Sequence, residues 1–122
     1  MARDHVIIYV LDTPPEQVRD ASPEERARVD AILAQILPVS RRAAGLRSDS
    51  VLGRSLGPAE LSKVRAPTLI VSVRDDGFGT YASAVYSASQ IKGAKFLGFE
   101  RGGHVWVGHD DEVMAEIAKH VK

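Results

Sequence analysis

The sequence has 122 residues, of which 44% are hydrophobic and 26% are charged, a balance that is ordinary for a soluble globular protein. Sixteen basic residues match sixteen acidic ones, so charge gives no argument for a nucleic-acid partner or an anionic membrane surface. Cysteine is absent, which excludes disulfides and thiol chemistry, and we expect a cytoplasmic protein. A chain of this length forms at most one domain.

The first predicted element is the apolar segment at residues 6–11. The side chains of residues 6–10 are β-branched or aromatic and suit a strand, but so short a run also suits the end of a buried helix. Both interpretations stay open. The segment is too short for a signal-peptide core or a membrane span, so we expect no membrane association.

A break at residues 13–15 precedes two predicted helices. Pro15 fits the first position of a short helix that ends near residue 21. Ser22 and Glu25 form a capping-box pattern around Pro23, which predicts a second helix that ends near residue 37, before Pro38. The apolar face of this second helix comprises Val29, Ile32, Leu33, Ile36 and Leu37.

The next stretch is predicted to be less regular. Residues 41–46 add a turn of helix, residues 47–56 are polar and turn-like, and Pro58 opens a short helix that ends near Val64. Arg41 and Arg42 are expected on a solvated helix face, with anion binding as a weaker alternative. Residues 1–65 thus form a helical region with a possible N-terminal strand.

An apolar strand is predicted at residues 67–73. Its β-branched run lacks polar alternation, which is typical of a strand that is buried on both faces in the interior of a sheet. Asp75 and Asp76 follow in a glycine-containing turn. Thr80 is placed to cap a helix over residues 81–91, and Gly93 is expected to end that helix in a left-handed conformation.

A second strand at residues 94–99 completes a strand-helix-strand unit. Strands joined through a helix lie parallel with a right-handed connection, so both carboxyl ends point to one edge of the sheet. Asp75 and Asp76 leave the first strand at that edge, and His104 leaves the second after two glycines. A carboxylate beside an imidazole is typical of an orienting acid and a general base. A final helix at residues 110–121 is expected to pack on the sheet.

The order of these motifs resembles a known family. The segments APTLIVSVRDD and IKGAKFLGFERGGHVWVGH, separated by a helix and followed by an amphipathic helix, resemble the C-terminal end of the α/β-hydrolase fold, whose serine hydrolases carry Ser, Asp and His in that order. The resemblance implies an α/β fold in which residues 66–122 are the C-terminal βαβα segment with a small parallel sheet, and residues 1–65 are lid-like. It also implies a small acyl substrate, such as an ester or an amide, in the intact enzyme.

By this resemblance the acid is Asp76 and the base is His104. The family's acid usually stands four residues before a proline, and Thr80 occupies that position relative to Asp76. Asp75 is the reserve choice for the acid. A Gly-His pair at the place of Gly103 and His104 is the family habit.

The family's serine nucleophile has one literal match here. Ser55 lies in a G-x-S-x-G pattern at residues 53–57 and precedes Asp76 and His104 in the family's order. The family's serine follows a buried strand, whereas Ser55 follows a polar run, and too little chain separates it from the acid for an intervening strand. We therefore expect a nucleophile outside this chain and a nearly inactive isolated chain.

Each candidate side chain also has a purely structural interpretation. His104 would then bond to local backbone and the two aspartates would stabilise the turn, which is the interpretation that we favour for Asp75 but not for Asp76. His109 is expected in a loop beside a helix N-cap. It shares no tetrahedral ligand spacing with His104, so we expect neither a metal nor a cofactor. Trp106 is expected in the core or in a pocket wall.

Two other functions remain open on the sequence. A binding or assembly module would keep the βαβα scaffold without chemistry, and it is favoured if Asp76 and His104 lie beyond hydrogen-bonding reach. A phospho-acceptor domain would explain the acidic pair, but the five alternating strands of that fold are missing. Because a two- or three-stranded sheet has unpaired edges, we expect a homodimer or another partner that covers them, and residues 6–11 are one candidate for that pairing.

Overall fold

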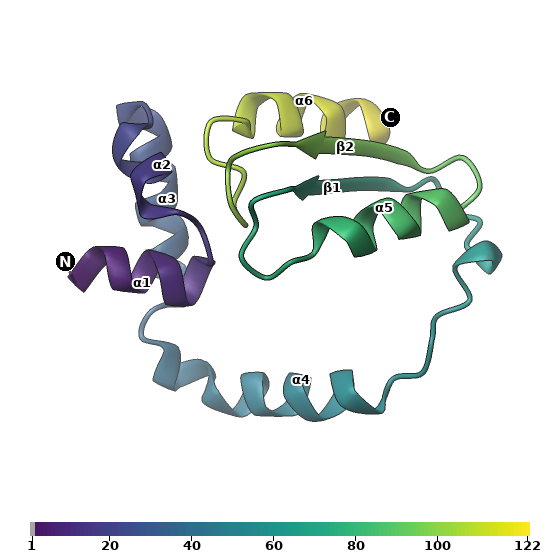
Figure 1. The fold of residues 1–122 in the computed structure, drawn as a ribbon, viewed down its shortest axis with the longest axis horizontal. Helices are drawn as coiled ribbons and strands as arrows, with labels where there is room; N and C mark the ends of the chain where they lie inside the picture. The colour runs from purple at the N-terminus through teal and green to yellow at the C-terminus, as the bar shows by residue number, and fades with distance from the viewer. Residues whose placement is uncertain (1) are drawn as a thin grey trace.

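The computed structural model describes residues 2–122 as a helical region followed by a small, helix-covered sheet (Figure 1). The helical region comprises α1 (Ala2–Leu11), α2 (Pro15–Asp20), α3 (Pro23–Ile36) and α4 (Ala43–Ser55). The sheet region comprises β1 (Leu69–Val73), α5 (Tyr81–Gln90), β2 (Lys95–Phe99) and α6 (Asp110–His120). Between residues 2 and 122 no helix is both long and apolar enough to cross a membrane.

The segment at residues 6–11 belongs to α1, so its strand interpretation is wrong, and with it the pairing of this segment with the sheet. Ile7 and Leu11 lie one helical turn apart and are almost fully buried, which places them on the inner face of the helix. They belong to a core cluster that consists of Ile7, Leu11, Val18, Val29, Leu33, Val105 and Val107. The last two residues follow β2, so the helical region and the sheet region share this core.

The predicted starts of α2 and α3 are confirmed. Pro15 is the first residue of α2, and the Ser22 hydroxyl caps α3 by accepting the backbone N–H of Glu25 at 3.2 Å. The Glu25 carboxylate does not complete the capping box. It accepts hydrogen bonds from Arg28 and from the backbone N–H of Gly108, which ties α3 to the loop before α6.

The connection from α3 to the sheet differs from the prediction. The sequence predicts a turn-like segment at residues 47–56, but α4 forms there. The predicted helix that begins at Pro58 is reduced to a 3₁₀ turn at Leu61–Lys63. Every residue of α4 is exposed, so no face of this helix packs on the core, and its polar composition also suits the turn-like segment that the sequence predicts.

Arg41 and Arg42 are exposed, as expected, in a 3₁₀ turn at Val39–Arg42 that precedes α4. The Arg42 guanidinium donates hydrogen bonds to the carbonyl groups of Gln35 and Ile36. These carbonyls end α3 and have no partner within the helix, so Arg42 serves as a C-terminal cap.

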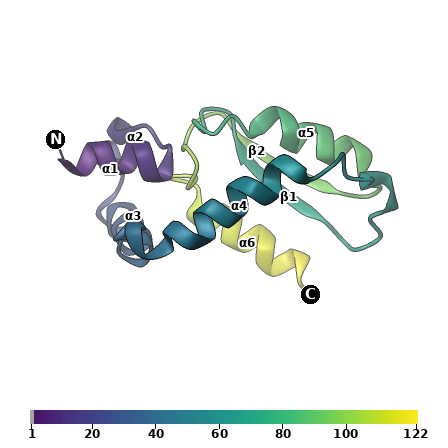
Figure 2. The ribbon, with the colours of Figure 1, turned by 90° about the horizontal axis from the view of Figure 1, so that it is seen from below.

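The strand-helix-strand unit is confirmed. β1 and β2 are parallel, with Leu69 opposite Lys95 and Val73 opposite Phe99. Gly93 has a φ of +78°, the left-handed conformation predicted at the end of α5. The helices α5 and α6 lie on opposite sides of the sheet (Figure 2). The α/β architecture with a small parallel sheet is therefore present in residues 66–122.

A second core forms between the sheet and α6. Val73 and Phe99, the last residues of the two strands, are buried against Val113 of α6, which is fully buried. The predicted packing of the last helix is confirmed at Val113 but not at Val121, which is 75% exposed. The carboxyl ends of both strands are thereby held side by side.

β1 is not the interior strand that the sequence predicts, because the described sheet has only two strands. The backbone bond from Lys95 to Thr68 shows that even-numbered residues of β1 bond to β2. Backbone groups alternate sides along a strand, so those of Leu69, Val71 and Val73 point to the outer edge. The apolar run of β1 is explained by α5 and α6, which cover the two faces of the sheet.

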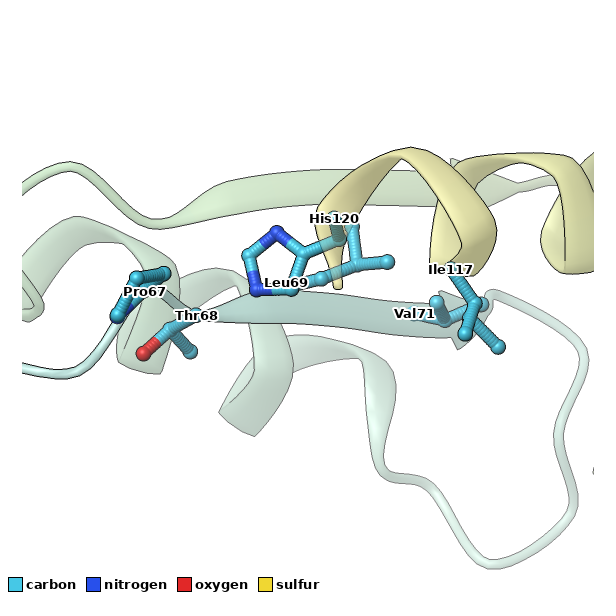
Figure 3. A pocket seen from close by; sticks show the side chains of 6 residues that line it. All are labelled: Pro67, Thr68, Leu69, Val71, Ile117 and His120. Carbon is cyan, nitrogen blue, oxygen red and sulfur yellow. The ribbon is translucent and has the colours of Figure 1, made fainter. Parts of the chain in front are cut away.

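A hollow of about 500 Å³ lies between β1 and the C-terminal end of α6 (Figure 3). It is lined by Pro67, Thr68, Leu69, Val71, Ile117 and His120. Because no residue of β2 lines it, the hollow opens on the outer side of β1. Within residues 2–122 the outer edge of β1 therefore has backbone groups without a neighbouring strand and a hollow in the surface beside them.

Replacing Ile7 by alanine is expected to lower the free energy of unfolding by about 2–5 kcal/mol, the range for deleting a large aliphatic side chain from a core. Ile7 is fully buried, whereas its neighbour Ile8 is 42% exposed. Ile8→Ala is the matched control and should change the free energy by no more than about 0.5 kcal/mol. Urea titrations followed by circular dichroism measure both variants, and equal effects would contradict this packing.

Candidate active site

Asp76 lies in the turn that follows β1 and accepts three hydrogen bonds. Its Oδ2 accepts from the Thr80 hydroxyl at 2.7 Å and lies 3.0 Å from Nδ1 of His104, and its Oδ1 accepts the backbone N–H of Phe78 at 3.0 Å. The carboxylate is buried, with 5% of the side chain exposed. A buried carboxylate with this many donors is fixed in position and orientation.

His104 approaches Asp76 from the loop after β2. Gly102 and Gly103 have φ values of +139° and +61°, which let the chain turn sharply just before the histidine. The imidazole is 45% exposed, and its ring meets the Phe78 ring edge-on at a centroid distance of 4.6 Å. Among residues 2–122 no group forms a hydrogen bond with Nε2 of His104, so this nitrogen is open to a substrate or a nucleophile.

The pKa of Asp76 lies below the ordinary value. Burial of the carboxyl raises the pKa, but the hydrogen bonds from Thr80, His104 and the backbone of Phe78 outweigh it and favour the ionised form. An ionised Asp76 accepts the proton of Nδ1, which leaves the lone pair of the neutral imidazole on Nε2. The arrangement thus prepares His104 to accept a proton at its exposed nitrogen.

The juxtaposition predicted for Asp76 and His104 is confirmed, while their catalytic role stays a prediction. Asp75 has a different place. Its Oδ1 accepts the backbone N–H of Gly103 at 2.9 Å, and its Oδ2 binds the side-chain amide of Gln17. These contacts agree with the structural role favoured for Asp75, and they leave Asp76 as the only one of the two in contact with the imidazole.

Thr80 does not cap α5 with its side chain, contrary to the prediction. It occupies the N-cap position, but its hydroxyl donates to Asp76 instead of accepting an N–H of the helix. Thr80 has helical backbone angles, with φ −79° and ψ −14°, whereas a residue that caps with its side chain has an extended backbone. Ser72 contacts the same hydroxyl at 3.3 Å, which extends the network into β1.

Ser55 is not placed as a nucleophile in this structure. It is the last residue of α4, and its hydroxyl donates to the carbonyl of Leu52 at 2.8 Å. A nucleophile elbow requires a sharp strand-to-helix turn, and no strand precedes Ser55 in the described chain. The G-x-S-x-G match is therefore the end of an exposed helix.

The remaining candidates have structural partners. His109 is the N-cap residue of α6, where its Nε2 contacts the carbonyl of Arg101 at 3.0 Å and its ring stacks on Phe99 at 4.0 Å. Trp106 packs against the second core and donates from Nε1 to Asp110 at 3.1 Å. Within residues 2–122 no group of three or more acidic, histidine or cysteine side chains is arranged to hold a metal ion.

One residue of the site has no signal in the sequence. The hydroxyl of Thr13, between α1 and α2, accepts the backbone N–H of His104 at 3.0 Å. The neighbouring Asp12 uses its carbonyl to accept the N–H of Gly77 at 3.1 Å. The Thr-Pro-Pro sequence indicates a break between helices, but nothing in it indicates a contact with the turn and the loop that carry Asp76 and His104.

No protein-family model matches the chain, and no curated protein or solved structure matches it. The resemblance to α/β-hydrolases therefore stays a prediction. The site itself, a buried carboxylate that orients a half-exposed imidazole, is the feature from which a function can be inferred.

Replacing Thr80 by valine is expected to raise the pKa of Asp76, because the strongest hydrogen bond to the ionised carboxylate is lost. Carboxyl ¹³C NMR of Asp76 against pH measures the midpoint. Thr68→Val is the control, since the Thr68 hydroxyl bonds only to the carbonyl of Ala66, and it should leave the midpoint unchanged. A midpoint that Thr80→Val does not raise would contradict the network.

The lowered pKa of Asp76 in the wild-type chain also affects the stability of the fold. The folded pKa of Asp76 is depressed below the ordinary value of 3.8, so the ionised carboxylate stabilises the fold above that pH, and the contribution is lost as the pH falls through the folded pKa. The stability difference between wild type and Asp76→Asn should therefore shrink on acidification below about pH 4. A difference that stays constant there would refute this linkage.

Proposed function

We propose that the chain supplies the acid and the base of a Ser-Asp-His hydrolase that acts on an ester, an amide or a similar small acyl substrate. Asp76 is the acid, His104 is the base, and the serine lies outside these 122 residues. The observation that carries the proposal is the distance of 3.0 Å between the buried carboxylate and Nδ1, combined with the exposed Nε2.

The proposed chemistry follows from this geometry. Nε2 of His104 takes the proton of a serine hydroxyl while the serine oxygen attacks the acyl carbonyl carbon, and Asp76 stabilises the imidazolium that forms. The imidazolium then returns the proton to the leaving alcohol or amine, and an acyl-enzyme remains. Water, deprotonated by the same nitrogen, attacks the acyl-enzyme, and the proton passes back to the serine oxygen.

An apolar acyl group has a wall beside the base. Phe78 is 54% exposed although its ring contacts the imidazole. An exposed aromatic side chain next to a reactive nitrogen favours apolar contact with a substrate over contact with water. This supports a small acyl substrate.

The hydroxyl groups near the acid and the base already have other partners. Thr80 donates to Asp76, Thr13 donates to the carbonyl of Leu11, and Ser72 contacts Thr80. None of the three is bonded to Nε2 of His104. Without a nucleophile and oxyanion donors an acid and a base retain little of the mechanism, so the isolated chain is expected to be nearly inactive.

A fluorophosphonate probe tests where the nucleophile lies. The isolated chain should not be labelled at Ser55, and Ser55→Ala should leave its weak hydrolysis of a p-nitrophenyl ester unchanged. Expressed together with the coding sequence that flanks it in its gene, the chain should hydrolyse the ester and be labelled at a serine outside residues 1–122. Asp76→Asn and His104→Ala should then each lower kcat by at least about a hundredfold.

Two results would count against the proposal. Covalent labelling of Ser55 in the isolated chain, with ester turnover lost in His104→Ala, would place a complete site within these residues. Flanking sequence that encodes no serine in a strand-turn context, with no activity in the longer product, would remove the hydrolase proposal altogether.

A second candidate function is an assembly module, favoured by the outer edge of β1. The strand has no charged residue between Leu69 and Val73, and such charges are a common protection against edge pairing. The outward N–H groups of Leu69, Val71 and Val73 have no backbone partner within the described chain. A second copy of the chain, or another partner with an extended strand, would complete the sheet there.

Val71→Pro tests this assembly. Proline removes the outward N–H of Val71 without removing a bond to β2, because only the even-numbered residues of β1 bond to β2. Light scattering should show a dimer for the wild-type chain at high concentration and a monomer for Val71→Pro, whose circular dichroism should be retained. Ser72→Pro is the control that breaks the sheet itself. A wild-type monomer at every concentration would exclude the homodimer.

A further inference from the structure

We propose that Thr13 is a positioning residue that holds His104 against Asp76, an inference that rests on the proposed function of this pair. Thr13 lies between α1 and α2, at the far end of the chain from the histidine, and is 2% exposed. Its hydroxyl contacts the backbone N–H of His104 and not the ring. Its effect is exerted through the backbone of the loop that carries the base.

The Thr13 hydroxyl is fixed by two hydrogen bonds. It donates to the carbonyl of Leu11 at 2.9 Å and accepts the backbone N–H of His104 at 3.0 Å. Since a hydroxyl has a single proton, the donation to Leu11 orients the oxygen lone pairs toward the histidine. The end of α1 thus determines where the backbone of the base lies.

The loop is shaped to reach this hydroxyl. A Cβ atom built on Gly103 would lie 2.5 Å from Cγ2 and 2.7 Å from Cα of Thr13, distances that no side chain tolerates. Gly103 also has a φ of +61°, which favours glycine. The glycine before the base is therefore required by Thr13 as well as by the turn.

A second contact holds the preceding amide. The backbone N–H of Gly103 is bound by Asp75, whose other carboxylate oxygen binds the side chain of Gln17 in α2. The two consecutive amides of Gly103 and His104 are thus held from residues 13–17, one directly and one through Asp75. The carbonyl of the adjacent Asp12 accepts the N–H of Gly77, so residues 12–17 contact both the loop that carries His104 and the turn that carries Asp76.

The imidazole has few other restraints. Its ring is 45% exposed, and the contacts that hold it are the bond to Asp76 and the edge of Phe78. Since few other contacts hold the half-exposed ring, a displacement of the loop backbone would move Nδ1 away from the Asp76 carboxylate. Loss of the Thr13 hydroxyl is therefore expected to weaken the bond between Asp76 and His104.

The test compares Thr13→Val with Thr13→Ser and Thr68→Val in the full chain by NMR. Valine removes the hydroxyl and keeps the branched shape, whereas serine keeps the hydroxyl. Thr68 is a matched control because its hydroxyl also donates to the carbonyl two residues earlier, at 2.9 Å, but contacts nothing of the site. The readouts are hydrogen exchange of the His104 amide and the titration midpoint of the Asp76 carboxyl.

Thr13→Val should speed exchange of the His104 amide about tenfold, the factor that corresponds to one hydrogen bond, and should raise the Asp76 midpoint. The amide of Val113 in α6 should be unaffected. Thr13→Ser and Thr68→Val should match wild type in both readouts. This pattern identifies a local action on the pair, which general loss of stability would not produce.

Two results in Thr13→Val would overturn the proposal. The first is wild-type exchange and an unchanged Asp76 midpoint in Thr13→Val. The second is equal acceleration at His104 and Val113, which would mean global destabilisation. If Thr13→Val does not fold, Thr13→Ser decides: wild-type readouts support the hydroxyl, and a disturbed pair shows that the methyl group matters instead. The proposed hydrolase function is tested separately by the serine label, so either idea can fail alone.

Discussion

The hydrogen bond between the Asp76 carboxylate and Nδ1 of His104 is the interaction on which the functional interpretation depends. It joins two groups that leave neighbouring parallel strands at the same end, and the burial of Val73, Phe99 and Val113 holds those ends together. The carboxylate is buried and satisfied by several donors, whereas the imidazole is half exposed. This difference in exposure suits an acid that orients the ring and a base that exchanges a proton with a substrate or a nucleophile.

The helical region is part of this arrangement. Its core includes Val105 and Val107 from the segment that follows His104. Thr13 binds the loop that carries His104, and Gln17 binds Asp75 in the turn that carries Asp76. By contrast α4 is exposed along its whole length and contributes nothing to this core. The structure therefore has one helical unit that supports the site, formed by α1, α2 and α3, and one exposed helix, α4, that is not part of it.

The site could be predicted from the sequence because it depends on local order: an apolar strand, an acidic turn, a helix, a second strand and a glycine pair before His104. Parallel topology then brings Asp76 and His104 together. Thr13 could not be predicted, since its contact with His104 spans 91 residues and leaves no periodic pattern. The exposed helix α4 could not be predicted, because the polar residues after Leu46 equally suit a turn-like segment. The apolar run of β1 predicts that both faces of the strand are covered, but it does not predict the number of neighbouring strands.

The ring ¹⁵N chemical shifts of His104, measured at about pH 8, show which ring nitrogen carries the proton and therefore whether Asp76 orients the base. We expect a proton on Nδ1 and a lone pair on Nε2 in the wild-type chain, and loss of this preference in Asp76→Asn. A proton on Nε2 in the wild type, or shifts that Asp76→Asn leaves unchanged, would contradict this role of Asp76.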